Sequence, residues 1–262
     1  DKALLLKLAD QADVLVEAFR PGVAARLGID YATLSARNPR LVYCSISAFG
    51  QDGPKAGRPA HDLAIQADSG VVSLNLGQDG RPAQPHMPVA DMAGSLMALA
   101  GILMALYRRQ QTGQGDRIDL SMQDALVAWL PNVVGPPFAE QRDPVVKDER
   151  SWGGNAMYHL YECADGRWLA LGGAEHKFAD TLFAALDRPD LGVLCHQPPG
   201  PAQQPARDFL AATFAREPLA HWCAFLAPLD VCWAPVRTLT EAFSDPHTRA
   251  RGMVQTDAAG GT

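Results

Sequence analysis

The sequence has little basic charge, few cysteines and no long uninterrupted apolar run, and each shortage excludes a class of protein. Lysine and arginine number 23 against 29 aspartate and glutamate residues, so the net charge is −6. This balance argues against a nucleic-acid partner, which normally requires a basic face. The cysteines are scattered and include no Cys-x-x-Cys pair, which predicts no metal site and favours free thiols in a reducing cytoplasm. They are Cys44, Cys163, Cys195, Cys223 and Cys232.

We expect neither a secretory signal nor a membrane partner. The chain opens with charged residues at Asp1, Lys2 and Lys7, too early for a signal peptide. The longest apolar run, Leu96 to Leu106, falls short of the roughly 20 residues that cross a membrane, so we interpret it as a core helix. There is no initiating Met, and a helical pattern comes before the first strand. We therefore expect the chain to be the middle of a larger protein.

The patterning indicates an α/β first half and an α+β second half. Leu41–Ile46 is a continuous β-prone run, typical of a strand buried in a parallel sheet. The loop Gly50–Pro54 follows it, at the strand end where open α/β sheets bind ligands. Later, Met157–Cys163 and Arg167–Leu171 are joined by an Asp-Gly turn and predict a hairpin. Amphipathic helices follow, so the second half can form a compact domain.

Two proton-transfer residues are each expected at the start of a helix. Asp91 comes just before the long apolar run, where unpaired backbone N–H groups and the helix dipole favour a carboxylate. His61 similarly opens a helical pattern. Such a pair suits acid/base or nucleophilic chemistry. The alternative is structural: aspartate is a common helix cap, and a lone histidine is more often a packing residue.

Several long motifs, in order, resemble those of the family III CoA-transferases and α-methylacyl-CoA racemases. The resemblance extends from about Ala12 to Gly252. The segments that carry it are Ala12–Gly22 (ADVLVEAFRPG), Asn38–Tyr43 (NPRLVY), Gly50–Pro54 (GQDGP), Thr112–Gly115 (TGQG), Tyr161–Trp168 (YECADGRW) and Asp245–His247 (DPH).

The resemblance implies an α/β fold with a Rossmann-like large domain, incomplete in this chain, and a smaller α+β domain. We expect residues 1–135 to form part of the large CoA-binding domain and 136–154 to be a linker. Residues 155–245 would then form the small α+β domain, and 246–262 would start a return segment to the large domain. Family members form interlocked homodimers, which we expect here with a linker passing between subunits.

The resemblance also assigns catalytic roles. Asp91 matches an aspartate that attacks the acyl-CoA carbonyl in transferases and acts as a base in racemases. His61 matches the racemase histidine, the second base, and Glu175 matches a glutamate that hydrogen-bonds it. Asp62 resembles a residue that helps hold the Asp91 carboxylate. We further expect the backbone N–H groups that begin the Asp91 helix to receive the enolate oxygen.

For coenzyme A, which would enter as part of the substrate with no prosthetic group, the resemblance implies Arg20, Arg26 and Arg58 near the phosphates. Tyr158 matches a tyrosine near the acyl pocket, although it can equally be a core aromatic of the hairpin. We predict a cytoplasmic racemase or epimerase of 2-methylacyl-CoA thioesters, acting in lipid metabolism. The alternative is a CoA-transferase with Asp91 as nucleophile. A third hypothesis is a CoA-binding domain without catalytic activity. The presence of His61, Asp91 and Glu175 argues against it.

Overall fold

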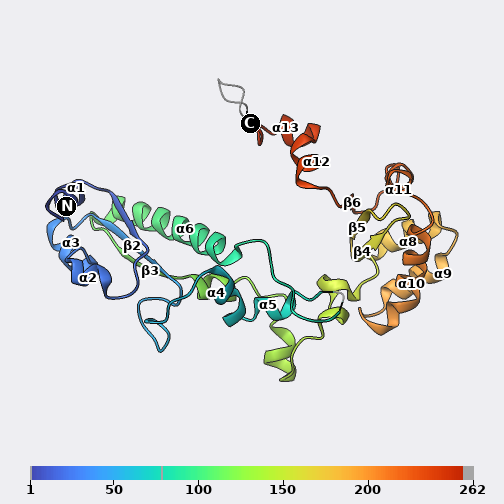
Figure 1. The fold of residues 1–262 in the computed structure, drawn as a ribbon, viewed down its shortest axis with the longest axis horizontal. Coiled ribbons are helices and arrows are strands. Elements are labelled where there is room, and N and C mark those ends of the chain that lie inside the picture. The colour runs from blue at the N-terminus through green and yellow to red at the C-terminus, as the bar shows by residue number, and fades with distance from the viewer. Residues whose placement is uncertain (1, 78, 256–262) are drawn as a thin grey trace. The chain divides into compact units, whose positions relative to one another are not determined.

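The structure, a computed structural model, describes residues 2–77 and 79–255. The chain forms two compact units, residues 1–142 and 143–262. Within the first unit a three-stranded sheet is surrounded by helices (Figure 1). Its elements are α1 (Lys2–Ala9), β1 (Val14–Glu17), α2 (Val23–Leu27), α3 (Tyr31–Arg37), β2 (Val42–Ser47), α4 (Asp62–Asp68), α5 (Val71–Leu74), α6 (Val89–Thr112), β3 (Arg117–Ser121) and α7 (Met122–Val127).

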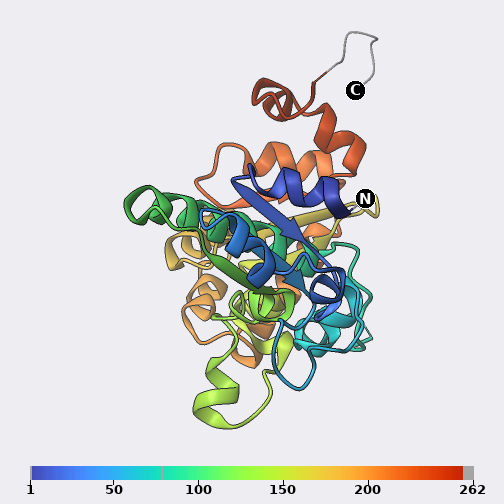
Figure 2. The same cartoon turned by 90° about the vertical axis from the view of Figure 1, so that its left-hand side faces the viewer.

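The sheet of the first unit is parallel, with strand order β1-β2-β3. Successive side chains of β2 point to opposite faces, so Tyr43 packs with α1 and α3 while Cys44 packs with α6. Val42, Tyr43 and Cys44 are all at most 1% exposed. The prediction of a buried parallel strand over Leu41–Ile46 is therefore confirmed. Figure 2 shows the same unit turned by 90°, with the blue helices and the green α6 around the strands.

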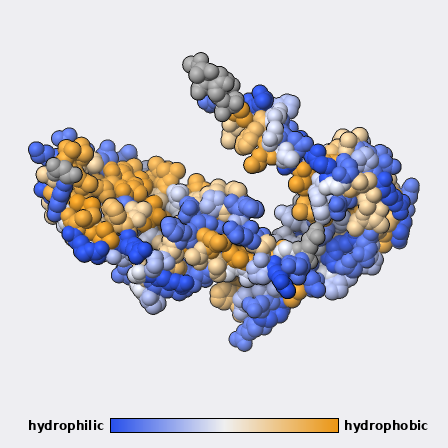
Figure 3. All heavy atoms as spheres, in the orientation of Figure 1, coloured by the Kyte–Doolittle hydropathy of each residue, from blue (hydrophilic) through white to orange (hydrophobic). Residues whose placement is uncertain are grey.

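Helix α6 contradicts the prediction of a core helix. Its buried residues are small: Ala90, Ala93, Gly94, Ala98 and Ala105. They let the helix approach the sheet closely, and a Cβ added at Gly94 would lie 3.0 Å from Met122 Cγ. Its large apolar side chains face outward and form the orange region over α6 in Figure 3. The residues at least 42% exposed are Met92, Leu96, Met97, Leu99, Leu103, Met104 and Tyr107.

By length and composition alone, α6 is also long and apolar enough to cross a membrane. The expectation of no membrane partner was based on the run Leu96–Leu106 alone, whereas the helix extends over 24 residues. Its inner face packs on β2 and β3. A core helix of a soluble protein satisfies the same length and composition criterion, so this feature alone is weak evidence for a membrane partner.

The second unit is built on an antiparallel sheet of order β4-β5-β6. The predicted hairpin is confirmed, with Tyr161 paired to Leu169. Tyr161, Phe183, Phe214 and Leu226 are buried in its core. The elements are β4 (Tyr158–Glu162), β5 (Trp168–Gly172), α8 (His176–Ala185), α9 (Pro189–Gly192), α10 (Gln204–Phe214), α11 (Leu219–Leu226), β6 (Trp233–Pro235), α12 (Leu239–Ser244) and α13 (Pro246–Ala250).

The segment expected to be a linker, residues 136–154, contains short helical turns. Pro136–Glu140 is π-helical and Val146–Asp148 is a 3₁₀ turn, whereas Arg150–Gly154 is interrupted by non-helical backbone at Trp152 and Gly153. Of the segment expected to return to the large domain, residues 246–255 carry α13, and residues 256–262 lie outside the described part of the chain.

Candidate functional site

A cavity of about 790 Å³ opens at the carboxyl ends of the parallel strands. Ala18 follows β1, Ser47 ends β2 and Met122 follows β3, and all three line it. This is the edge at which open α/β sheets bind ligands, as the sequence predicts. The remaining lining residues are Phe19, Arg20, Pro21, Ile46, Ala48, Ala56, Arg58, Pro59, Ala60, His61, Leu63, Ala64 and Ala67.

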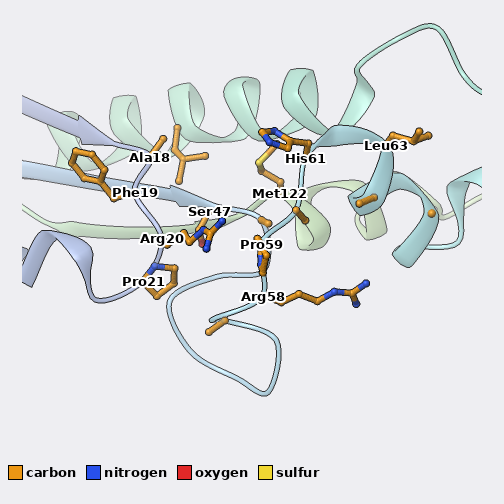
Figure 4. A pocket seen from close by; sticks show the side chains of 16 residues that line it. Ala18, Phe19, Arg20, Pro21, Ser47, Arg58, Pro59, His61, Leu63 and Met122 are labelled. Atoms are coloured by element: carbon orange, nitrogen blue, oxygen red, sulfur yellow. The ribbon is translucent and has the colours of Figure 1, made fainter.

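Arg20 and Ser47 provide the polar groups on one side of this cavity. Both residues line the cavity, and in the view of Figure 4 the Arg20 side chain points toward Ser47. The Ser47 hydroxyl oxygen is buried and has no hydrogen-bond partner among the described residues. A guanidinium beside an unpaired hydroxyl suits an anionic oxygen-rich ligand. Arg26, in the last turn of α2, is not among the residues that line this cavity.

Arg58 lines the same cavity but is held by a second residue. Its guanidinium is 3.2 Å from Asp68 Oδ1, and in Figure 4 it extends away from Arg20. Asp68 also accepts hydrogen bonds from Lys55 and, at 3.0 Å, from Gln123 Nε2. The Lys55 hydrogen bond is the main cause that lowers the pKa of Asp68. Asp68, the last residue of α4, therefore connects the loop that precedes His61 with α7.

His61 is the N-cap of α4, as the sequence predicts. Its backbone carbonyl accepts from Ala64 and Ile65. Its imidazole lines the cavity and has no hydrogen-bond partner among the described residues, while Ile65 one turn later is fully buried. The helix therefore anchors the backbone of His61 and leaves the ring available to a ligand.

Asp91 is the third residue of α6, because the helix begins two residues earlier than expected, at Val89. Pro88, the N-cap, provides no side-chain cap. Asp62 caps the helix from α4 instead: its Oδ1 accepts from Ala90 N at 2.8 Å and Asp91 N at 3.2 Å. Asp62 thus holds the backbone of Asp91, whereas the resemblance implied support for its carboxylate.

The expectation that N–H groups at the start of α6 receive an enolate oxygen is wrong in this structure. Each of the first four is already used. Val89 donates to Met87 and Met92 to Pro88, while Ala90 and Asp91 both donate to Asp62. In this structure these four N–H groups are therefore not free to bind a ligand oxygen.

Sequence reasoning missed Gln66, which is fully buried on α4. Its amide nitrogen donates to Asp62 Oδ2 at 2.5 Å and to the Met87 carbonyl at 3.0 Å. The spacing of four residues from Asp62 places both side chains on one helix face, and this was the available signal. Asp68 was also missed, although it lies one turn after Ala64 on the same helix.

Glu175 and Tyr158 belong to the second unit. Glu175 is the N-cap of α8 and lines a separate cavity of about 470 Å³ with Arg150, His176 and Cys195. Its expected hydrogen bond to His61 stays a prediction. Tyr158 begins β4 opposite Gly172 and is 43% exposed, so it is not a buried aromatic of the hairpin core. Among the described residues, no group of three or more His, Cys, Asp or Glu side chains could hold a metal ion.

Comparison with known proteins agrees with this architecture. The profile described as CoA-transferase family III matches residues 1–261. An acetyl-CoA:oxalate CoA-transferase of Acetobacter aceti is 33% identical, covering 97% of this chain and 66% of the relative. The human α-methylacyl-CoA racemase is 34% identical, covering 95% and 65% respectively. The chain thus spans about two thirds of the length of these curated relatives.

A solved structure supports the same assignment. A CAIB/BAIF family protein from Brucella suis superposes with a TM-score of 0.79 at 29% identity, covering 96% of this chain and 67% of that one. The predicted family and fold are therefore confirmed, while the relatives' names divide between racemase and transferase. The chain belongs to CoA-transferase family III.

Proposed function

We propose that the protein is a racemase or epimerase of 2-methylacyl-CoA thioesters that moves the α-proton between two bases, Asp91 and His61. The observation that carries the proposal is the contact of Asp62 with the backbone of Asp91. Asp62 directly follows His61, so one residue connects the two candidate bases, which lie on different helices. The unpaired imidazole of His61 on the cavity wall supports a role in proton transfer.

Each residue has a defined task in this reaction. One base removes the α-proton beside the thioester carbonyl, the electrons move onto the carbonyl oxygen as an enolate, and the other base returns a proton to the opposite face. Arg20 and Ser47 would hold anionic groups of the CoA portion in the cavity. Glu175 would orient His61 and stabilise its cation, as a carboxylate does behind a catalytic histidine.

The second candidate is a CoA-transferase in which Asp91 is the nucleophile. It is favoured by the similarity to the Acetobacter enzyme, which is as close in identity as the racemases. Asp91 would attack the acyl carbonyl, and CoA thiolate would leave. That thiolate would then attack the Asp91 carbonyl of the resulting anhydride, giving an aspartyl-CoA thioester and releasing the donor carboxylate. An acceptor carboxylate would then take the CoA. His61 has no required task in this sequence.

The discriminating experiment incubates the full-length protein with one stereoisomer of 2-methylacyl-CoA in deuterated water, without an acceptor acid. The racemase proposal predicts deuterium at the α-carbon together with the opposite stereoisomer. A parallel reaction adds acceptor acids and hydroxylamine, which traps acyl or aspartyl-CoA intermediates. CoA transfer that requires an acceptor, with no α-deuteration, would establish the transferase instead.

We also propose that the full-length protein is a homodimer, on the basis of family membership. Light scattering over a range of low protein concentrations, combined with activity at each concentration, tests it. A stable and active monomer contradicts the proposal.

A further inference from the structure

We propose that Gln66 is a positioning residue, which holds the Asp62 carboxylate against the start of α6 and thereby sets the place of Asp91. The inference rests on the proposed function only in that Asp91 is taken as the reacting residue. It holds for either chemistry, because Asp91 acts in both.

The burial of Gln66 is the first part of the argument. The side chain is 0% exposed, while its neighbours on the outer side of α4, Leu63 and Ala67, are exposed. Burying an amide is unfavourable unless its polar atoms are bonded. Its Nε2 donates to Asp62 and to the Met87 carbonyl, whereas its buried Oε1 has no hydrogen-bond partner among the described residues. An apolar residue of similar size would fill the space, so the amide is needed for its hydrogen bonds.

The second part is the direction of these bonds. Gln66 donates to Oδ2 of Asp62 and leaves Oδ1 to accept from Ala90 and Asp91. A carboxylate whose two oxygens are bonded on opposite sides cannot rotate without losing one set of partners. The amide also donates to Met87, in the segment that leads into α6. Gln66 therefore fixes both the cap of α6 and the chain that enters it.

The third part is that α6 has no cap of its own, since Pro88 offers no side-chain acceptor. The orientation of Asp62 consequently determines how the first turn, which contains Asp91, is held. A small displacement of a reacting group is costly: about 1 Å can reduce a rate by roughly 10²-fold. The rate should therefore respond to Gln66 although it contacts no substrate in this scheme.

The experiment compares the full-length wild type with Gln66→Leu, Asp62→Asn and the double variant. We expect Gln66→Leu to lower kcat about tenfold to a hundredfold with little change in KM. If Gln66 acts through Asp62, the double variant should lose less than the product of the two single losses. The matched control is Gln204→Leu, because Gln204 likewise donates to an aspartate four positions away, Asp208, but on an exposed helix face. It should leave kcat unchanged.

A second measurement is independent of any activity. Hydrogen exchange of the Ala90 and Asp91 amides should accelerate in Gln66→Leu, while exchange in β2 stays at the wild-type rate. Unchanged protection of both amides overturns the proposal, as do multiplicative losses of kcat. If the wild type has neither racemase nor transferase activity, the proposed function fails, and the exchange rates still decide whether Gln66 holds the start of α6.

Discussion

The carboxylate of Asp62 accepts a hydrogen bond from the backbone N–H of Asp91, with 3.2 Å between Oδ1 and N. This contact involves neither carboxylate oxygen of Asp91. The backbone of Asp91 is therefore fixed from another helix while its side chain remains available to a substrate. Asp62 thus supports the start of α6, and Asp91 carries the carboxylate that we propose to react, so substitutions can separate the two roles.

Asp91→Asn should abolish turnover in either chemistry, because an amide is neither a base nor an adequate nucleophile. We expect a loss of at least about 10²–10⁴-fold. The melting temperature should change little, since the cap of α6 comes from Asp62. Asp124→Asn is the matched control, because Asp124 is also acidic, exposed and in the first turn of a helix. Normal turnover of Asp91→Asn would remove this residue from the mechanism.

His61→Ala should slow α-deuteration strongly if His61 is one of two bases, because one face of the α-carbon then lacks a proton donor and acceptor. Glu175→Gln should slow it too if Glu175 orients the imidazole. The measurement is the rate of deuterium incorporation by mass spectrometry, with the exposed His221→Ala as control. A His61→Ala enzyme with full acceptor-dependent CoA transfer would instead support the transferase.

Asp68→Asn should destabilise the protein near neutral pH and matter less in acid. The hydrogen bond from Lys55 lowers the pKa of Asp68, so the folded state favours its ionised form. The resulting stability is present above the unfolded pKa, about 3.9, and is lost as pH falls through the lower folded value.

Urea unfolding of wild type and Asp68→Asn at several pH values between 7 and 3 measures this effect. The difference in free energy of unfolding should shrink toward acid pH. Asp79→Asn is the control, because the Asp79 carboxylate is 64% exposed and lies 4.0 Å from the Nε of the Arg81 guanidinium. A difference that is constant over the whole range would show that the Asp68 contacts do not depend on its charge.

Cys232 should be the fastest thiol to react with a disulfide reagent in the native protein. It is exposed, whereas burial raises the pKa of Cys44, Cys163 and Cys195 to about 11 each. Since the thiolate is the reactive form, these three should react only on unfolding. Cys232→Ser should remove the fast phase of labelling at pH 8, and a fast phase that persists would contradict the described exposure.

Local signals predicted much of the fold. The capping position of His61, the buried strand through Tyr43 and the hairpin at Asp165-Gly166 follow from short-range rules, and the structure contains all three. The burial of α6 was not predictable in this way. Hydrophobicity alone suggests that Leu96 is buried. The face of α6 that packs against the sheet is instead the one whose small residues, such as Gly94, allow the helix to come close.

The sequence named some of the residues that line the cavity at the carboxyl ends of the strands, but Asp62, Asp91 and Arg26 are not among them. His61, Arg20 and Arg58 do share one cavity. The partner of Arg58 is Asp68, however, and the partners of Asp62 are the backbone of α6 and the Gln66 amide. Such pairings depend on how helices approach one another in space, which residue types alone do not determine.

Helix α6 is anchored at both ends. At its far end the Arg109 guanidinium contacts the Asp13 carboxylate at 2.8 Å and the Arg40 carbonyl at 3.0 Å. Asp91 and Arg109 are 18 residues apart, about 27 Å along a straight helix. Because α6 is held at both ends, a change in its tilt at the Arg109 end also moves the end that carries Asp91. The position of the Asp91 carboxylate, which we propose to be the reacting group, is thus mechanically linked to Arg109 at the opposite end of the helix.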